Sequence, residues 1–68
     1  MDSARLKSII ILNGETSAML AEAIGISAQT MSAKINEKNG AEFTQSEIAK
    51  IKERYNLTPE EVELIFFK

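Results

Sequence analysis

The stretch from Ser17 to Ile35, SAMLAEAIGISAQTMSAKI, contains two short helical segments separated by very little chain. Gly25 supplies the left-handed residue that ends a helix. Ser27 is a typical N-cap, so a second helix begins almost at once, with Met31 and Ile35 as its buried positions one turn apart. Two helices joined so closely must cross at a steep angle. Any fold of this chain therefore has to be built around that corner.

The crossing of these two segments needs a small side chain at the point of closest approach. Ala21 lies in the middle of the first segment, and its single methyl group lets the second helix come near. Larger apolar side chains are predicted to fill the angle between the helices, namely Leu20, Ile24, Ile26 and Met31.

Three further helical segments complete the chain, and none shows the sustained alternation of a strand. The first begins near Ser3 as N-cap and stops at Asn13-Gly14; its inward positions are Leu6, Ile9 and Ile10. Thr16 is predicted to cap the first helix of the corner described above. Residues 36–40, which follow the second helix of the corner, are predicted to form an exposed loop. The last two segments open with the capping boxes Thr44-Gln-Ser-Glu47 and Thr58-Pro-Glu-Glu61, the second with Pro59 at the first helical position.

In the segment that begins with the capping box Thr44–Glu47, the residues predicted to face inward are Ile48, Ile51 and Tyr55. The sequence therefore predicts an all-α fold of five helices, in which residues 1–68 form a single domain.

The residue types that the chain lacks exclude several classes of function. The chain has no Cys and no His, which removes disulfides, thiolate nucleophiles, a histidine base and the usual zinc sites. A chain of 68 residues is also too short for a sizeable pocket, so a binding protein is favoured over an enzyme. The paired carboxylates Glu60 and Glu61 are explained by helix capping. The apolar run Ile9–Leu12 is far shorter than the ~20 residues of a membrane span, and we expect a cytoplasmic protein.

The spacing of Leu20-Ala21, Ile24-Gly25-Ile26 and Met31 resembles the helix-turn-helix of phage repressors and Cro proteins. With one helix before the motif and two after it, nearly the whole chain resembles their five-helix DNA-binding domain. The C-terminal run FTQSEIAKIKERYNLTPEEVELIFF is similar to small regulators encoded in prophages of Gram-positive bacteria. Many family members have an apolar residue three positions after that of Met31, where this chain has Lys34. The alternative for the motif is an αα-corner in another kind of helical domain.

The resemblance implies that the second helix of the motif enters the major groove of DNA. In this second helix, Met31 and Ile35 are expected to be buried. The remaining residues are expected to point outward and form the predicted base-reading set: Ala28, Gln29, Ser32, Ala33 and Asn36. By resemblance, the main base-reading positions are Ala28, Gln29 and Ala33. A glutamine can bond adenine N6 and N7 together, and alanine methyls can touch the thymine methyl. Such a face favours A·T-rich half-sites.

Contacts to the DNA backbone need N–H groups, hydroxyls and cations beside the groove. The predicted set is Thr16, Ser17, Ser27, Thr30, Lys34, Lys38 and Asn39, each of which also has an ordinary role as a capping or solvated residue. Eight Lys and Arg stand against ten Asp and Glu, a net charge of −2, so the electrostatic attraction to DNA is limited.

The leading hypothesis is a Cro-like or repressor-like transcriptional regulator that occupies operator DNA, with no cofactor and no small-molecule ligand implied by the resemblance. The alternative is an antirepressor or antitoxin that keeps the fold and binds a protein, which the net charge of −2 favours.

The C-terminal helix holds more apolar residues than one face can bury. Val62, Ile65 and Phe66 can close the core, which leaves Leu64 and Phe67 on another face. We predict that Leu64 and Phe67 form a homodimer interface that DNA helps to complete, since two protomers would read two half-sites. The alternative is a frayed tail folded back on the surface.

Overall fold

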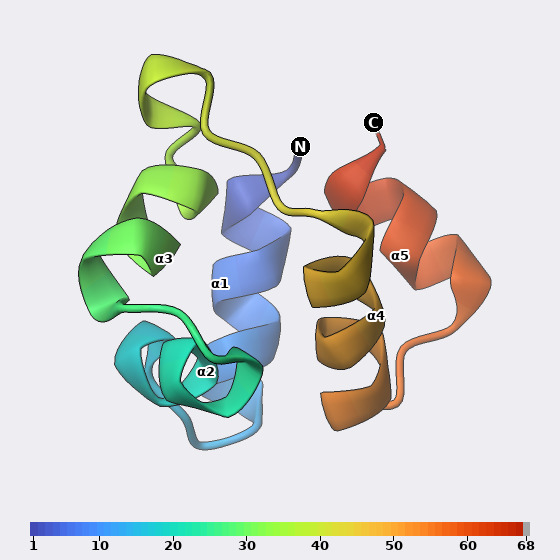
Figure 1. The fold of residues 1–68 in the computed structure, drawn as a ribbon. Helices are drawn as coiled ribbons and strands as arrows, with labels where there is room; N and C mark the ends of the chain where they lie inside the picture. The colour runs from blue at the N-terminus through green and yellow to red at the C-terminus, as the bar shows by residue number, and fades with distance from the viewer. Residues whose placement is uncertain (68) are drawn as a thin grey trace.

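The computed structural model describes residues 1–67, and all regular structure in that range is helical. The elements in chain order are α1 (Ser3–Leu12), α2 (Ser17–Ile24), α3 (Ala28–Ile35), the short 3₁₀ turn η1 (Lys38–Gly40), α4 (Gln45–Arg54) and α5 (Pro59–Phe66). The predicted all-α fold with five α-helices is confirmed. In the view of Figure 1, α1 lies between α3 and α4, α2 lies at the bottom, and α5 lies to the right of α4; α5 packs against both α1 and α4.

Local side-chain bonds explain where most helices begin. Thr16 and Ser27 accept the backbone N–H three residues ahead, at 3.2 and 3.0 Å, so both predicted N-caps are confirmed. Both predicted capping boxes are also present, with Glu47 and Glu61 each bonding back to the N-cap backbone at 2.9 Å.

The start of α1 differs by one residue from the prediction. Asp2, not Ser3, is the N-cap, because its carboxylate accepts the backbone N–H of Arg5 at 3.0 Å. Ser3 is the first helical residue, and its hydroxyl donates instead to the carbonyl of Ile35, 2.5 Å away at the end of α3. The Ser3 hydroxyl is thus used in a contact with α3 and does not cap α1.

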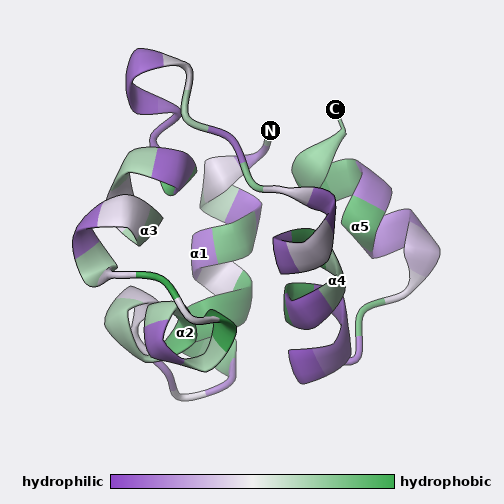
Figure 2. Ribbon diagram, in the orientation of Figure 1, coloured by the Kyte–Doolittle hydropathy of each residue, from purple (hydrophilic) through white to green (hydrophobic). Residues whose placement is uncertain are grey.

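The core is formed by apolar side chains from all five helices. Its buried members are Leu6, Ile10, Leu20, Ala21, Ile24, Met31, Ile35, Ile51, Leu57 and Ile65. Most predicted inward positions are confirmed as buried, while five are only half-buried at the edge of the core: Ile9, Ile26, Tyr55, Val62 and Phe66. Figure 2 shows the division between largely apolar α2 and largely polar α4.

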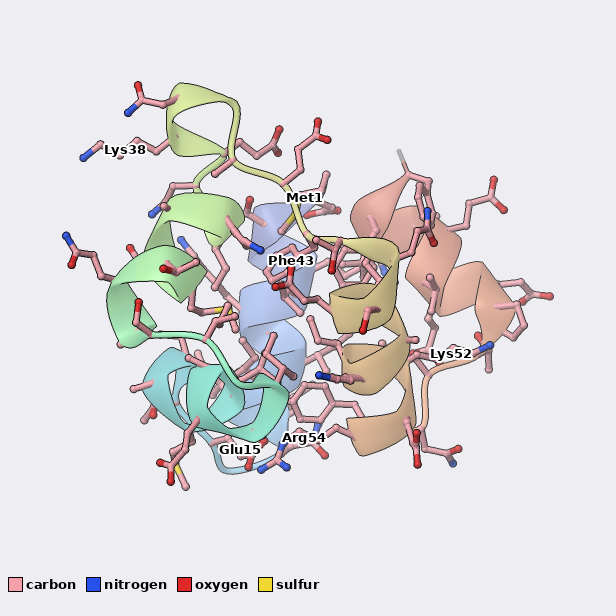
Figure 3. All side chains as sticks on the ribbon, viewed as in Figure 1. Met1, Glu15, Lys38, Phe43, Lys52 and Arg54 are labelled. Atoms are coloured by element: carbon pink, nitrogen blue, oxygen red, sulfur yellow. The ribbon has the colours of Figure 1, made fainter. Side chains whose placement is uncertain are left out.

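A polar cluster ties the turn between α1 and α2 to the end of α4. The Glu15 carboxylate accepts hydrogen bonds from Arg54, with Nε at 3.0 Å, and from the hydroxyl of Tyr55 at 2.8 Å. Figure 3 places Glu15 and Arg54 together at the base of the molecule. The hydrogen bond from Arg54 is the main cause that lowers the pKa of Glu15, whereas burial and the bond to Glu15 raise the pKa of Tyr55 to about 12.

Several large apolar side chains lie on the surface. Leu64 and Phe67 are 39% and 57% exposed, as expected for residues outside the core of their own domain. The sequence analysis did not anticipate that Ile11, Leu12 and Met19 would also be exposed. None of the helices in residues 1–67 is long and apolar enough to cross a membrane.

Candidate nucleic-acid interface

The corner between α2 and α3 has the geometry that the sequence predicts. Gly25 adopts φ +83°, a left-handed conformation that an L side chain rarely tolerates, and it ends α2. The backbone N–H of Ile26 then returns to the carbonyl of Ala21 at 3.0 Å. Ser27 starts α3, and its hydroxyl both accepts from the Thr30 N–H and donates to the Thr30 hydroxyl at 2.9 Å.

The outward face of α3 contains most of the predicted base-reading residues. Ala28, Gln29, Ser32 and Asn36 are exposed, whereas Ala33 is half-buried. The expectation that all five point freely outward therefore needs one correction, because Ala33 lies at the edge of the face. The Asn36 amide donates to the Ser32 hydroxyl at 3.4 Å, so these two polar side chains are already linked along the helix.

A shallow groove brings predicted residues of α2 and α3 together. It has a volume of about 380 Å³ and is lined in part by Thr16, Ser17, Ser32 and Asn36. Lys7 of α1 lines the same groove, and the sequence analysis had missed this exposed cation. The signal for it was its position three residues before Ile10, which places Lys7 near the side of α1 that packs against the helix-turn-helix.

Lys34 does not lie where the sequence analysis expected it. Its ammonium is 2.5 Å from Glu47 Oε1, and the two side chains are 14% and 12% exposed. The ammonium also lies 6.0 Å from the ring centroid of Phe43, which Figure 3 shows between α3 and α4. Lys34 was expected to face a DNA phosphate, but its charge is directed into the protein instead.

The carboxylate of Glu47 is shaped by the same contacts. Burial raises its pKa, but the hydrogen bonds from Lys34 and from the Thr44 backbone outweigh burial and leave the pKa below its ordinary value. The contact with Lys34 therefore favours the charged form of the Glu47 carboxyl.

The segment after α3 carries the remaining predicted backbone contacts. Lys38 and Asn39 belong to η1; Asn39 has φ +55°, and Glu37, just before η1, has φ +52°. Both predicted residues are exposed, and Lys38 extends away from the body of the molecule in Figure 3. The predicted exposure of residues 36–40 is confirmed, although the loop contains a short 3₁₀ turn.

The two predicted dimer residues occupy different surroundings on α5 and just after it. Phe67 lines a hollow of about 260 Å³ together with Met1, Phe43 and Phe66. Leu64 is exposed outside that hollow.

Comparison with known protein families identifies the domain that contains the corner between α2 and α3. The profile of the Cro/C1-type HTH DNA-binding domain matches residues 5–64. The chain belongs to this Cro/C1-type family. No curated protein and no solved structure gives a significant match to the chain.

Family membership makes α2 and α3 the helix-turn-helix and the protein a DNA-binding regulator. In a Cro/C1-type domain, α3 is the helix that enters the major groove, and α2 crosses the DNA backbone. The exposed residues of α3 therefore lie on the second helix of the motif. Within residues 1–67, no cluster of acidic side chains is suited to hold a metal ion.

Proposed function

We propose that this protein is a Cro-like or repressor-like transcriptional regulator of a phage or prophage that acts in the cytoplasm by occupying its operator. The observation that carries the proposal is the exposed face of α3, where a glutamine and small side chains stand clear of the core. Occupancy needs no chemistry, so regulation would follow from steric exclusion at the operator.

Base recognition in this proposal rests on three side chains of α3. Gln29 would bond adenine N6 and N7, and the methyl groups of Ala28 and Ala33 would touch thymine methyls. Ser32 and Asn36, already linked to each other, would lie along the same groove. The proposed target is therefore double-stranded operator DNA with A·T-rich half-sites.

The proposed backbone contacts surround that helix. They are Thr16, Ser17, Ser27, Thr30, Lys38 and Asn39, with Lys7 added on the strength of the groove that it shares with Ser17 and Ser32. Lys34 is left out because its ammonium is paired with Glu47. Two cations near the groove give only a modest electrostatic attraction per protomer.

A second protomer would supply the affinity that one weakly charged domain lacks. We propose that Leu64 and Phe67, both exposed, form the homodimer contact, which DNA completes by holding two half-sites about one helical turn apart.

The test is a fluorescence titration of DNA fragments that flank the gene, repeated at two salt concentrations, with the parent protein and with Gln29→Ala. We expect Gln29→Ala to weaken operator binding by about 1–3 kcal/mol and to relax the preference at one base pair, with non-specific binding nearly unchanged. An equal loss on all sequences would make Gln29 a backbone contact and contradict its assignment.

The second candidate function is protein binding by an antirepressor or antitoxin, favoured by the net charge of −2. The same titration separates the two. Absence of any salt-dependent DNA binding by the parent would favour the protein-binding role.

A further inference from the structure

One carboxylate oxygen joins the end of α3 to the beginning of α4. Glu47 Oε1 accepts the backbone N–H of Thr44 at 2.9 Å, which closes the capping box of α4. The same oxygen accepts the ammonium of Lys34 at 2.5 Å, from the last turn of α3. The two helices are thereby connected through a single, largely buried ion pair.

The capping box of α5 can be compared with the capping box of α4. Thr58 and Glu61 reproduce both bonds of the box at the same distances, 2.9 and 3.1 Å, at the start of α5. Among the hydrogen bonds of the described residues, the Glu61 carboxylate bonds only its N-cap, whereas Glu47 also holds a lysine. The contact with Lys34 is therefore an addition to capping, and Glu61 offers a natural control for capping alone.

The end of α3 has a second attachment, which comes from α1. The Ser3 hydroxyl donates to the carbonyl of Ile35 at 2.5 Å, which satisfies one of the carbonyls left open at the end of a helix. A cation in the last turn is also favourable for the helix dipole, and Lys34 supplies it. The last turn of α3 is thus held from α1 and from α4.

We propose that Lys34 and Glu47 are positioning residues that fix the orientation of the reading face of α3, and that neither contacts DNA. The inference rests on the proposed function, because orientation matters only if α3 reads base edges. Small displacements of a recognition element weaken its contacts, so loss of the anchor should lower operator affinity without changing the attraction to DNA in general.

The direction in which Glu47→Gln changes operator affinity distinguishes a positioning role from a purely electrostatic effect. Glu47→Gln removes a negative charge, which by charge alone would strengthen binding to every DNA sequence. It retains an oxygen that can accept the Thr44 N–H, since glutamine also serves in a capping box. If the residue positions α3, operator affinity falls instead.

The experiment compares the parent with Glu47→Gln, Lys34→Met, the double variant and the control Glu61→Gln. Each is titrated with operator and with non-operator DNA at two salt concentrations. We expect both single variants to bind operator about five- to tenfold more weakly, with non-operator binding nearly unchanged. The double variant should lose no more than either single variant, and Glu61→Gln should match the parent.

Three results of these titrations would overturn the inference. Tighter operator binding by Glu47→Gln would show that its charge acts only at long range. A uniform loss with Lys34→Met, together with a shallower salt dependence, would make Lys34 a phosphate contact. Additive losses in the double variant would show that the two residues act independently.

A measurement without DNA tests the anchor itself. Amide hydrogen exchange at Ile35 and Asn36 should be faster in Glu47→Gln and Lys34→Met than in Glu61→Gln, with exchange in α1 unchanged. Equal exchange in all variants would overturn the inference even if the parent binds operator. If the parent selects no operator sequence, the proposed function fails and positioning of a reading face fails with it, while faster exchange still identifies a structural anchor.

Discussion

Ala21 is buried in the middle of α2, where the sequence predicts the close crossing with α3, and enlarging it provides a severe test of the fold. The side chain is 1% exposed in the middle of α2, and its neighbours in the core include Leu20, Ile24 and Met31. Ala21→Leu adds three carbon atoms to a side chain that is already buried in the core. Overpacking of this kind costs about 1–3 kcal/mol. The total stability expected for a domain of this size is only about 3–10 kcal/mol.

The expected change in melting temperature follows from that cost. Each kcal/mol shifts Tm by about 4–8 °C in a small domain, so a cost of about 2 kcal/mol lowers Tm by about 8–16 °C. Ala23→Leu is the matched control, because it makes the same change two residues later on an exposed position of α2. Surface changes stay within about 0.5 kcal/mol, so the control should melt within a few degrees of the parent. Thermal unfolding followed by circular dichroism measures both. Equal melting temperatures for the two variants would refute the placement of Ala21 at a tight crossing.

Three further predictions concern charge and assembly. The hydrogen bond from Arg54 lowers the pKa of Glu15 below its ordinary value of 4.5, so this contact stabilises the fold above that pH and is lost as pH falls through the folded pKa; Glu15→Gln should therefore lose less Tm on acidification than the parent. Lys38→Ala should weaken binding to all sequences and reduce the slope of log K against log salt by about 0.9, and a sequence-selective loss would contradict this. The double variant Leu64→Glu, Phe67→Glu should keep its fold but lose the two-per-operator complex in sedimentation, whereas unchanged stoichiometry and affinity would exclude this face as the dimer contact.

The parts of the fold that the sequence predicted are those decided within a few residues. An N-cap bonds an N–H three positions ahead, so Thr16, Ser27 and the two capping boxes can be recognised from spacing alone. Gly25 was equally predictable, because the left-handed end of a helix favours glycine. Helical period then selected Met31 as core and Gln29 as surface.

What the sequence could not settle depends on residues far apart in the chain. Glu15 and Arg54 are separated by 39 positions, and nothing local pairs them. From its local sequence, Lys34 is expected to point outward, because Glu47, its partner, lies on α4 and comes near only in the folded chain. The capping box already explained Glu47, so nothing in the sequence suggested a second partner. Ser3 was mistaken for a cap because its true partner, the carbonyl of Ile35, is 32 residues away.

The internal ion pairs change how binding to DNA should be understood. Arg54 and Lys34 each hold a carboxylate that belongs to another helix or turn, so two of the eight basic side chains are already paired within the fold. The cations proposed to meet the DNA backbone are Lys7, which lines the groove beside α3, and Lys38 of η1, and two cations permit few phosphate contacts. With so little general attraction to DNA, the proposed operator binding has to come from base contacts made by α3 and from their repetition in a second protomer. Such contacts tolerate little error in the placement of the helix, which gives a physical reason for fixing the last turn of α3 to two other helices.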